Sequence, residues 1–272
     1  YPMKKLFLLS ALILSALVVS GCGSTSEKPL VLEKGASAQN LFEKGLSLMK
    51  KDRDKARSYC RQVVQIFANT SYAAEAKYQL GVSYYQQKGI SNYTIAAQEF
   101  SDFVNTYPSH PLAPQAQLYL AQCYINMLPK PGRDQANTRS AQQELKKLKS
   151  SYPLTPQAKE ADVYLAKVEN LLGDDLFLVA NFYVKTHAWK AAVKRLQQMI
   201  DLYPSYSKND RVYFLMAKSL FKMREFTRGQ DYVTLLQDSY PKSPWTVKGK
   251  KLLEQERKKP YSKPAQTPPA KT

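Results

Sequence analysis

The chain has 272 residues, and its 40 Lys and Arg against 22 Asp and Glu give it a formal net charge of +18. Its two histidines do not lie near other His or Cys at metal-ligand spacing, and there is no phosphate-binding glycine loop, serine-hydrolase motif or zinc-protease motif. The sequence therefore argues against an enzyme, and it indicates neither a cofactor nor a metal.

Residues 1–21 have the features of a secretory signal peptide. Lys4 and Lys5 precede an apolar run over residues 6–19, which is too short to span a bilayer and suits the core of a signal peptide. Residues 1–2 stand before the first Met and do not fit a translation start, so we expect them to be an artefact.

Cys22 follows this segment in the context Val19-Ser20-Gly21-Cys22, which resembles the bacterial lipobox. We therefore predict a lipid on Cys22, and the alternative is an ordinary Cys behind a signal peptide. Gly23, where an Asp would favour the inner membrane, predicts sorting to the outer membrane. Residues 22–37 are then a flexible tether. An exported chain seldom meets nucleic acid, so its positive charge favours acidic proteins or anionic lipid.

Five segments between residues 38 and 254 share one spacing of apolar residues. Counting back from a fixed end point, which is Tyr-Pro in four segments, positions twelve, eight and five residues earlier hold one small and two larger residues. These triplets are Ala56, Cys60, Val63; Ala96, Phe100, Phe103; Ala141, Leu145, Leu148; Ala192, Leu196, Met199; and Gly229, Val233, Leu236. The spacing predicts a helix with one buried face that the Pro ends.

A second helix precedes each triplet. It carries a small residue followed three positions later by a large one, and the small residues are Gly45, Gly81, Ala121, Ala180 and Ala217. The paired pattern resembles the tetratricopeptide repeat, a helix–turn–helix of about 34 residues. We therefore predict an all-α tetratricopeptide-repeat superhelix of about five units over residues 38–254. Cys60 and Cys123 take inward-facing positions in it and are predicted to be buried and free.

Three stretches depart from the regular repeat. Residues 128–133 are rich in turn formers and predict a longer loop in the third unit, which either has no binding role or is used by a partner. The long interval between Pro153 and Pro204 predicts one long helix or two helices with a bend near Gly173. Residues 255–272 are basic and Pro-rich and predict a disordered tail.

Three motifs carry a resemblance to a known family. They are Tyr107-Pro108-Ser109-His110-Pro111, Arg133-Asp134-Gln135, and Ala188-Trp189-Lys190-Ala191-Ala192-Val193-Lys194-Arg195. With the lipobox and the repeat spacing, they resemble the BamD family, the lipoproteins of the outer-membrane β-barrel assembly machinery, over about residues 20–245. The chain departs from the family at Phe67-Ala68, where Tyr-Pro is usual, and in its Pro-rich tail.

The resemblance implies a lipid-anchored protein at the outer membrane that faces the periplasm. It implies binding to unfolded outer-membrane proteins, through their C-terminal segments, and to the periplasmic part of a BamA-like barrel protein. The alternative is another tetratricopeptide lipoprotein scaffold, such as a secretin pilotin or a peptidoglycan-linked coordinator. Pilotins usually have about six more uniform repeats and lack the motif around Trp189.

Two sets of site residues follow from the repeat and the resemblance. Peptides lie along the first helices of tetratricopeptide repeats, and the inward positions there predict a peptide-binding groove at Phe42, Met49, Tyr78, Tyr85 and Gln122. The alternative for Phe42 and Tyr78 is a place in the core between repeats. Arg195 matches a family segment that faces BamA, so the resemblance implies a contact there, against the alternative of a solvated Arg.

Overall fold

The computed structural model describes residues 35–259, so the expected signal peptide, Cys22 and the tail from residue 260 lie outside the described residues. Contacts divide the chain into one unit over Tyr1–Ala36 and a second over Ser37–Thr272. The fold that follows is that of the described part of the second unit.

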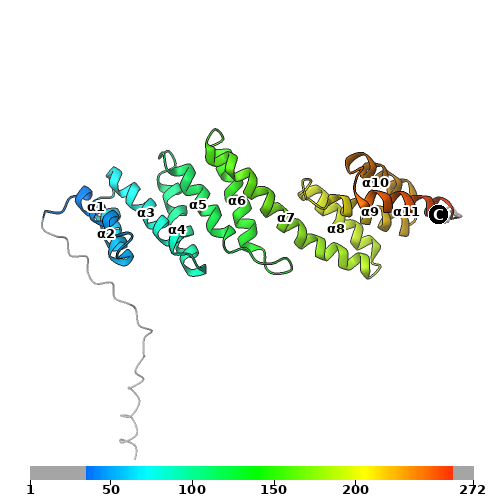
Figure 1. Cartoon of the computed structure of the whole chain (residues 1–272), viewed down its shortest axis with the longest axis horizontal. Helices are drawn as coiled ribbons and strands as arrows, with labels where there is room; N and C mark the ends of the chain where they lie inside the picture. Colours follow the sequence, from blue (N-terminus) through cyan, green and yellow to red (C-terminus); the bar gives the residue numbers. More distant parts are fainter. Residues whose placement is uncertain (1–34, 260–272) are drawn as a thin grey trace, which may run out of the picture. The chain divides into compact units, whose positions relative to one another are not determined.

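The described secondary structure is helical throughout, as the repeat pattern predicts (Figure 1). The helices are α1 (Ala38–Leu48), α2 (Arg53–Ile66), α3 (Ser71–Gln87), α4 (Ile90–Thr106), α5 (Ala113–Ile125), α6 (Ala136–Ser151), α7 (Pro156–Lys185), α8 (Trp189–Leu202), α9 (Asn209–Lys222), α10 (Phe226–Ser239) and α11 (Pro244–Arg257).

Each helix packs against the next one along the chain, and the odd-numbered helices also contact one another in sequence from α1 to α11. Among residues 35–259, the even-numbered helices α2 to α10 make no such contacts with each other. Neighbours on the inside of a curved stack lie closer together than neighbours on the outside. The odd helices therefore form the inner, concave layer of a superhelix, and the even helices form its outer layer.

The predicted triplets form the contact between the two layers. All fifteen residues are buried, and so are the five small residues of the inner helices. The small residues at Gly45 and Gly81 are needed because side chains of the partner helix fill the space beside them. A Cβ on Gly81 would lie 2.7 Å from Cε1 of Phe100. This packing confirms the predicted tetratricopeptide-repeat superhelix, with five helix pairs and α11 behind the last.

Helix α7 resolves the long interval in favour of one continuous helix of 30 residues, about 45 Å long at 1.5 Å per residue. Its first half packs with Leu145 and Leu148 of α6, and its second half packs with Leu196 and Met199 of α8. It therefore closes the third unit and opens the fourth. Gly173 lies inside this continuous helix, and it makes room for a neighbour, because a Cβ there would lie 2.5 Å from Cδ2 of Tyr206.

The longer loop of the third unit is held against α7. The backbone N–H of Gly132 donates to Oδ1 of Asp175 at 2.8 Å, and Leu178 lies beside the same glycine. The buried side chain of Gln135 donates to the carbonyls of Lys130 and Arg133. These hydrogen bonds give the loop a structural role.

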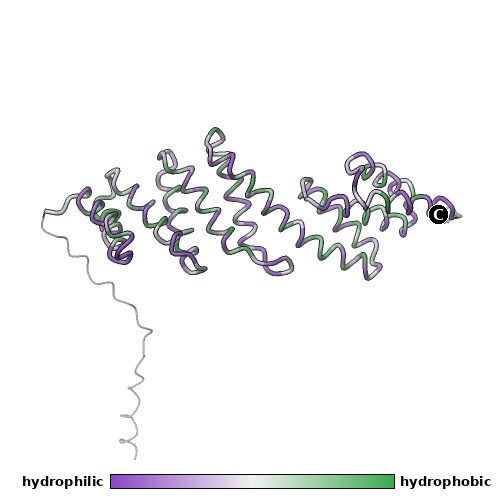
Figure 2. The backbone as a smooth tube through the Cα atoms, in the orientation of Figure 1, coloured by the Kyte–Doolittle hydropathy of each residue, from purple (hydrophilic) through white to green (hydrophobic). Residues whose placement is uncertain are grey.

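Helix α11 continues to Arg257, three residues into the stretch expected as the tail. Apolar and polar residues alternate along the described helices (Figure 2), and none of them is long and apolar enough to cross a membrane. Cys60 and Cys123 are buried and free, as predicted.

Candidate protein-binding surfaces

Three side chains link the inner helices of neighbouring units through hydrogen bonds. The hydroxyl of Tyr85 on α3 donates to Oε1 of Gln122 on α5 at 3.0 Å. The Nε2 group of Gln122 donates in turn to the hydroxyl of Tyr164 on α7 at 3.0 Å. We call Tyr85, Gln122 and Tyr164 the Tyr–Gln row. It places polar groups beside aromatic rings along the concave layer.

The Tyr–Gln row is fixed by packing as well as by hydrogen bonds. The Tyr85 ring lies 4.9 Å from the Tyr119 ring and 5.8 Å from the Tyr93 ring, measured between centroids. All three members of the row are partly exposed. Burial raises the pKa of the Tyr85 and Tyr164 hydroxyls above the ordinary value. Both hydroxyls therefore keep their protons and remain donors at neutral pH.

Two of the five predicted groove residues lie in the core between repeats. Tyr78 is 8% exposed, and its ring lies 5.7 Å from that of Phe103. Phe42 is 5% exposed and packs against Tyr72. These positions agree with the alternative that was left open for both residues. Substitution of either would first disturb the packing of neighbouring units, so neither is a suitable probe of binding.

The structure brings Tyr85 and Gln122 together, and Tyr78 reaches Tyr85 through the ring of Tyr119, which contacts both. Met49 follows the last residue of α1 and is partly exposed. Tyr119 and Tyr164 were missed by sequence reasoning. Tyr119 is not among the inward positions that the repeat spacing predicts, and Tyr164 lies in the first half of α7, for which no site residue is predicted.

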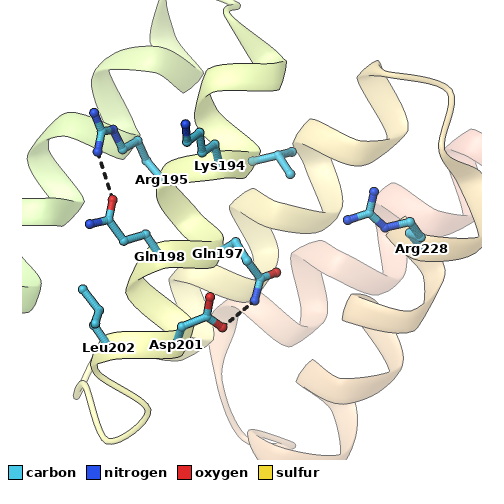
Figure 3. A pocket seen from close by; sticks show the side chains of 8 residues that line it. Lys194, Arg195, Gln197, Gln198, Asp201, Leu202 and Arg228 are labelled. Carbon is cyan, nitrogen blue, oxygen red and sulfur yellow. Dashed lines mark hydrogen bonds between the residues drawn. The ribbon is translucent and has the colours of Figure 1, made fainter.

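A second surface lies on the outer layer, where α8 faces α10. An open groove of about 750 Å³ lies there, and Figure 3 shows the side chains that line it. Its lining is Val193, Lys194, Arg195, Gln197, Gln198, Asp201 and Leu202 from α8 and Arg228 from α10. The side chain of Leu202 is 53% exposed. The groove therefore combines basic groups with accessible apolar surface.

Arg195 is partly exposed, as expected from its place between Ala192 and Leu196. Its Nη1 group donates to Oε1 of Gln198 at 2.9 Å, and no carboxylate within residues 35–259 forms an ion pair with it. Across the groove, Arg228 is paired with Glu225. Arg195 thus keeps most of its hydrogen-bonding capacity for a partner.

Trp189, which gives the third sequence motif its register, has a packing role. Its ring stacks on the His187 ring with centroids 5.1 Å apart and packs against the core cluster of α7 and α8. Trp189 is also the first residue of α8. It anchors the first turn of α8 to the core, six residues before Arg195 on the same helix.

No group of three or more His, Cys, Asp or Glu that could hold a metal occurs in the part of the chain that the structure describes. The surfaces that stand out are therefore the Tyr–Gln row and the groove around Arg195, and both offer hydrogen bonds and apolar contact to another polypeptide.

The chain is similar to several known proteins. The model of the YfiO family, described as outer membrane lipoprotein, matches residues 34–231. The outer membrane protein assembly factor BamD of Caulobacter vibrioides is 22% identical over 255 residues, which are 93% of this chain and 83% of that protein. The putative outer membrane protein assembly factor BamD of Aquifex aeolicus is 33% identical over 217 residues, which are 78% of this chain and 68% of that protein.

Among solved structures, the TPR2AB domain of yeast Sti1 in complex with pHSP90 shares 14% identity and covers 80% of this chain and 84% of that one. Its TM-score of 0.38 is too low for the two chains to superpose as wholes.

Proposed function

The chain belongs to the YfiO outer membrane lipoprotein family, and from this premise we propose that it is a non-enzymatic subunit of the machinery that assembles outer-membrane proteins. Related chains are named for that process, which supports a role in outer-membrane protein assembly and a location at the outer membrane. In this proposal Cys22 carries the lipid, and the superhelix faces the periplasm. The intact mass of the chain extracted from membranes would show the lipid.

We infer that the concave layer binds unfolded outer-membrane proteins through their C-terminal segments. The observation that carries this inference is the Tyr–Gln row, which crosses α3, α5 and α7 and offers hydroxyl and amide groups beside aromatic rings. An extended segment with an aromatic end would gain both apolar contact and hydrogen bonds there. Tyr85 and Gln122 carry the contact, Met49 lies at the edge of the same layer, and Phe42 and Tyr78 support it from the core.

A pair of matched substitutions tests the groove. Tyr85→Phe removes the hydroxyl and keeps the ring, so we expect it to weaken binding of a synthetic outer-membrane protein C-terminal peptide by about 0.5–1.5 kcal/mol. Tyr232→Phe is the control, because the Tyr232 hydroxyl also donates to a glutamine, Gln197, at 2.9 Å, but on the outer layer. Isothermal titration calorimetry of both variants checks this. Equal affinities in the two would remove the Tyr–Gln row from the site.

We propose that the groove around Arg195 holds the periplasmic part of a BamA-like barrel protein. Arg195 has no carboxylate partner among residues 35–259 of the chain. A guanidinium can hold one carboxylate by two parallel hydrogen bonds. Val193 and Leu202 beside it supply apolar contact. An acidic and partly apolar segment of the barrel protein matches this surface.

Co-purification from detergent-solubilised outer membranes tests the Arg195 contact. Arg195→Leu should lower the recovered barrel protein about tenfold, the loss that one charge-assisted contact of about 1.4 kcal/mol predicts. Arg195→Lys should restore only part of it, because an ammonium cannot supply the forked pair of donors. Arg139→Leu is the control, since Arg139 lies on α6 and is exposed. Undiminished recovery with a normal helical spectrum would show that this face is not the contact, and recovery of a secretin would favour the pilotin alternative.

A further inference from the structure

One guanidinium of the concave layer lies between two aromatic rings from different helices. Arg211 lies in the first turn of α9, and its Cζ atom is 4.7 Å from the centroid of the Phe177 ring on α7. The same atom is 5.3 Å from the ring centroid of Trp245 on α11. Arg211 therefore joins three inner helices at the C-terminal end of the described superhelix.

This guanidinium has no acceptor of its own. Its Nε atom is buried without a hydrogen-bond partner, and no ion pair or hydrogen bond of its side chain occurs within residues 35–259. Two acids of the adjoining segments, Asp174 on α7 and Asp210 on α9, are already engaged. Asp174 accepts from the Tyr206 hydroxyl and from Lys208, and Oδ2 of Asp210 accepts from Ser243 at 2.6 Å.

A buried donor without an acceptor is costly, on the order of 1–3 kcal/mol for a typical group. Most such donors in folded proteins are satisfied, so an exception calls for an explanation. The cation–π contacts with Phe177 and Trp245 stabilise the charge but satisfy none of the N–H groups. The two Nη groups of Arg211 are not fully buried, and they likewise have no acceptor among residues 35–259.

A second cation lies beside the same indole. The Nζ atom of Lys248 is 4.2 Å from the Trp245 ring centroid, and among residues 35–259 it forms no ion pair. The Phe214 ring lies 5.1 Å from the Trp245 ring. Two cations without carboxylate partners and three aromatic rings thus meet in one region, which suits a ligand that is anionic and carries an apolar neighbour.

We propose that Arg211 is the anchor of a carboxylate-binding site for acidic peptide segments. Phe177 and Trp245 contact the guanidinium, and the Nε atom is buried, so the edge formed by its two Nη groups remains for the ligand. A flat carboxylate can accept two parallel hydrogen bonds from that edge. The rings of Trp245 and Phe214 then contact the residue next to the carboxylate. A lipid phosphate fits less well, because the site lies on the concave layer between helices. The proposal does not depend on the function proposed above.

The carboxylate has two possible sources in a peptide, and one experiment separates them. Three acetylated hexapeptides ending in Tyr-Phe are titrated at constant ionic strength: one with a free C-terminus, one amidated, and one amidated with a Glu before the Tyr. The readouts are the Nε–Hε signal of Arg211 and the indole signal of Trp245 in nitrogen-edited NMR spectra of the purified chain. We expect at least one carboxylate peptide to bind about tenfold more tightly than the neutral amide and to shift both signals.

Three variants test whether the tighter binding of carboxylate peptides depends on Arg211. Arg211→Gln should abolish it, Arg211→Lys should keep part of it, and Lys190→Gln, which removes an exposed charge on α8, should leave it unchanged. Should Arg211→Gln not fold, the shift of the Arg211 signal in the unaltered chain decides alone. Equal binding of all three peptides, a preference that survives in folded Arg211→Gln, or a response to phosphatidylglycerol vesicles but not to peptides would overturn the proposal.

Discussion

Two arginines of this chain contact aromatic rings but differ in whether their guanidinium N–H groups have hydrogen-bond acceptors. Arg57 is 4% exposed, lies over the Tyr84 ring, and donates to Ser83 and to Gln87. Arg211 also lies over aromatic rings but donates to nothing among the described residues. Both arginines contact aromatic rings, so the missing acceptor is what separates a structural arginine from a candidate binding residue.

At the same scale, Gly173 shows how a missing side chain permits a long-range contact. The Tyr206 ring occupies the space where a Cβ would stand, and the Tyr206 hydroxyl donates to Oδ1 of the neighbouring Asp174 at 2.6 Å. The backbone N–H of Ser207 donates to Oδ1 of Asn170 on the same helix at 2.8 Å. The loop between α8 and α9 is thereby fastened to the middle of α7.

We predict that Gly173→Ala lowers the free energy of unfolding by about 1–2 kcal/mol. The added methyl group would displace the Tyr206 ring, a kind of overpacking that costs about 1–3 kcal/mol, and the better helix propensity of Ala offsets up to about 1 kcal/mol. Gly249→Ala is the matched control, because its Cβ would meet the end of the flexible Leu236 side chain at 3.2 Å. Urea unfolding followed by circular dichroism should show Gly249→Ala to be neutral or stabilising. A stable Gly173→Ala would mean that the Tyr206 contact contributes little.

At the scale of the element, α11 covers the apolar side of the last helix pair. It contacts both α9 and α10, and Leu253 packs in one cluster with Phe221 and Val233. Repeat proteins need such a terminal cover, because each unit buries its apolar face only against a neighbour. The polar outer side of α11 ends the stack.

We predict that removal of residues 241–272 destabilises the superhelix and causes association of the exposed ends, whereas removal of residues 260–272 does neither. The first truncation uncovers Phe221 and Val233, and the second removes no described contact. Thermal unfolding and size-exclusion chromatography of the two truncated chains check this. Equal thermal stability of both would show that α11 is dispensable.

At the scale of the whole molecule, burial keeps two thiols and a tyrosine hydroxyl of the core in their neutral, protonated forms. Burial raises the pKa of Cys60 and of Cys123 from 9.0 to about 12, and it raises the pKa of Tyr78 from 10.0 to about 12. In the unfolded chain these groups lose their protons at their ordinary values. The unfolded state therefore binds fewer protons than the folded state above pH 9.

We predict that the free energy of unfolding is constant up to about pH 9 and then falls up to about pH 12. Stability falls with pH wherever the unfolded state binds fewer protons, and the folded pKa values of Cys60, Cys123 and Tyr78 set the upper end of their own contribution. Urea unfolding across this range measures the effect. The double variant Cys60→Ala and Cys123→Ala should be less stable at pH 8 but should lose less stability between pH 9 and pH 12. An identical slope in both chains would contradict a contribution from the thiols.

The sequence by itself determined the repeat architecture, because a helix with one buried face needs apolar residues at a fixed spacing, and that spacing is visible in the sequence. The triplets around Phe100, Leu145 and Leu196 and the small residues facing them all lie in the predicted core. The free cysteines and the family also followed from local patterns.

Only the tertiary structure decided which inward residues are core and which are surface. Tyr78 and Tyr85 have equivalent spacing in the sequence, yet Tyr78 packs between Phe100 and Phe103 while Tyr85 bonds to Gln122. The difference depends on how closely neighbouring units approach, which no local pattern encodes. The sequence did not predict a role for Arg211 for the same reason. Its surroundings come from three helices that meet only when the superhelix is formed.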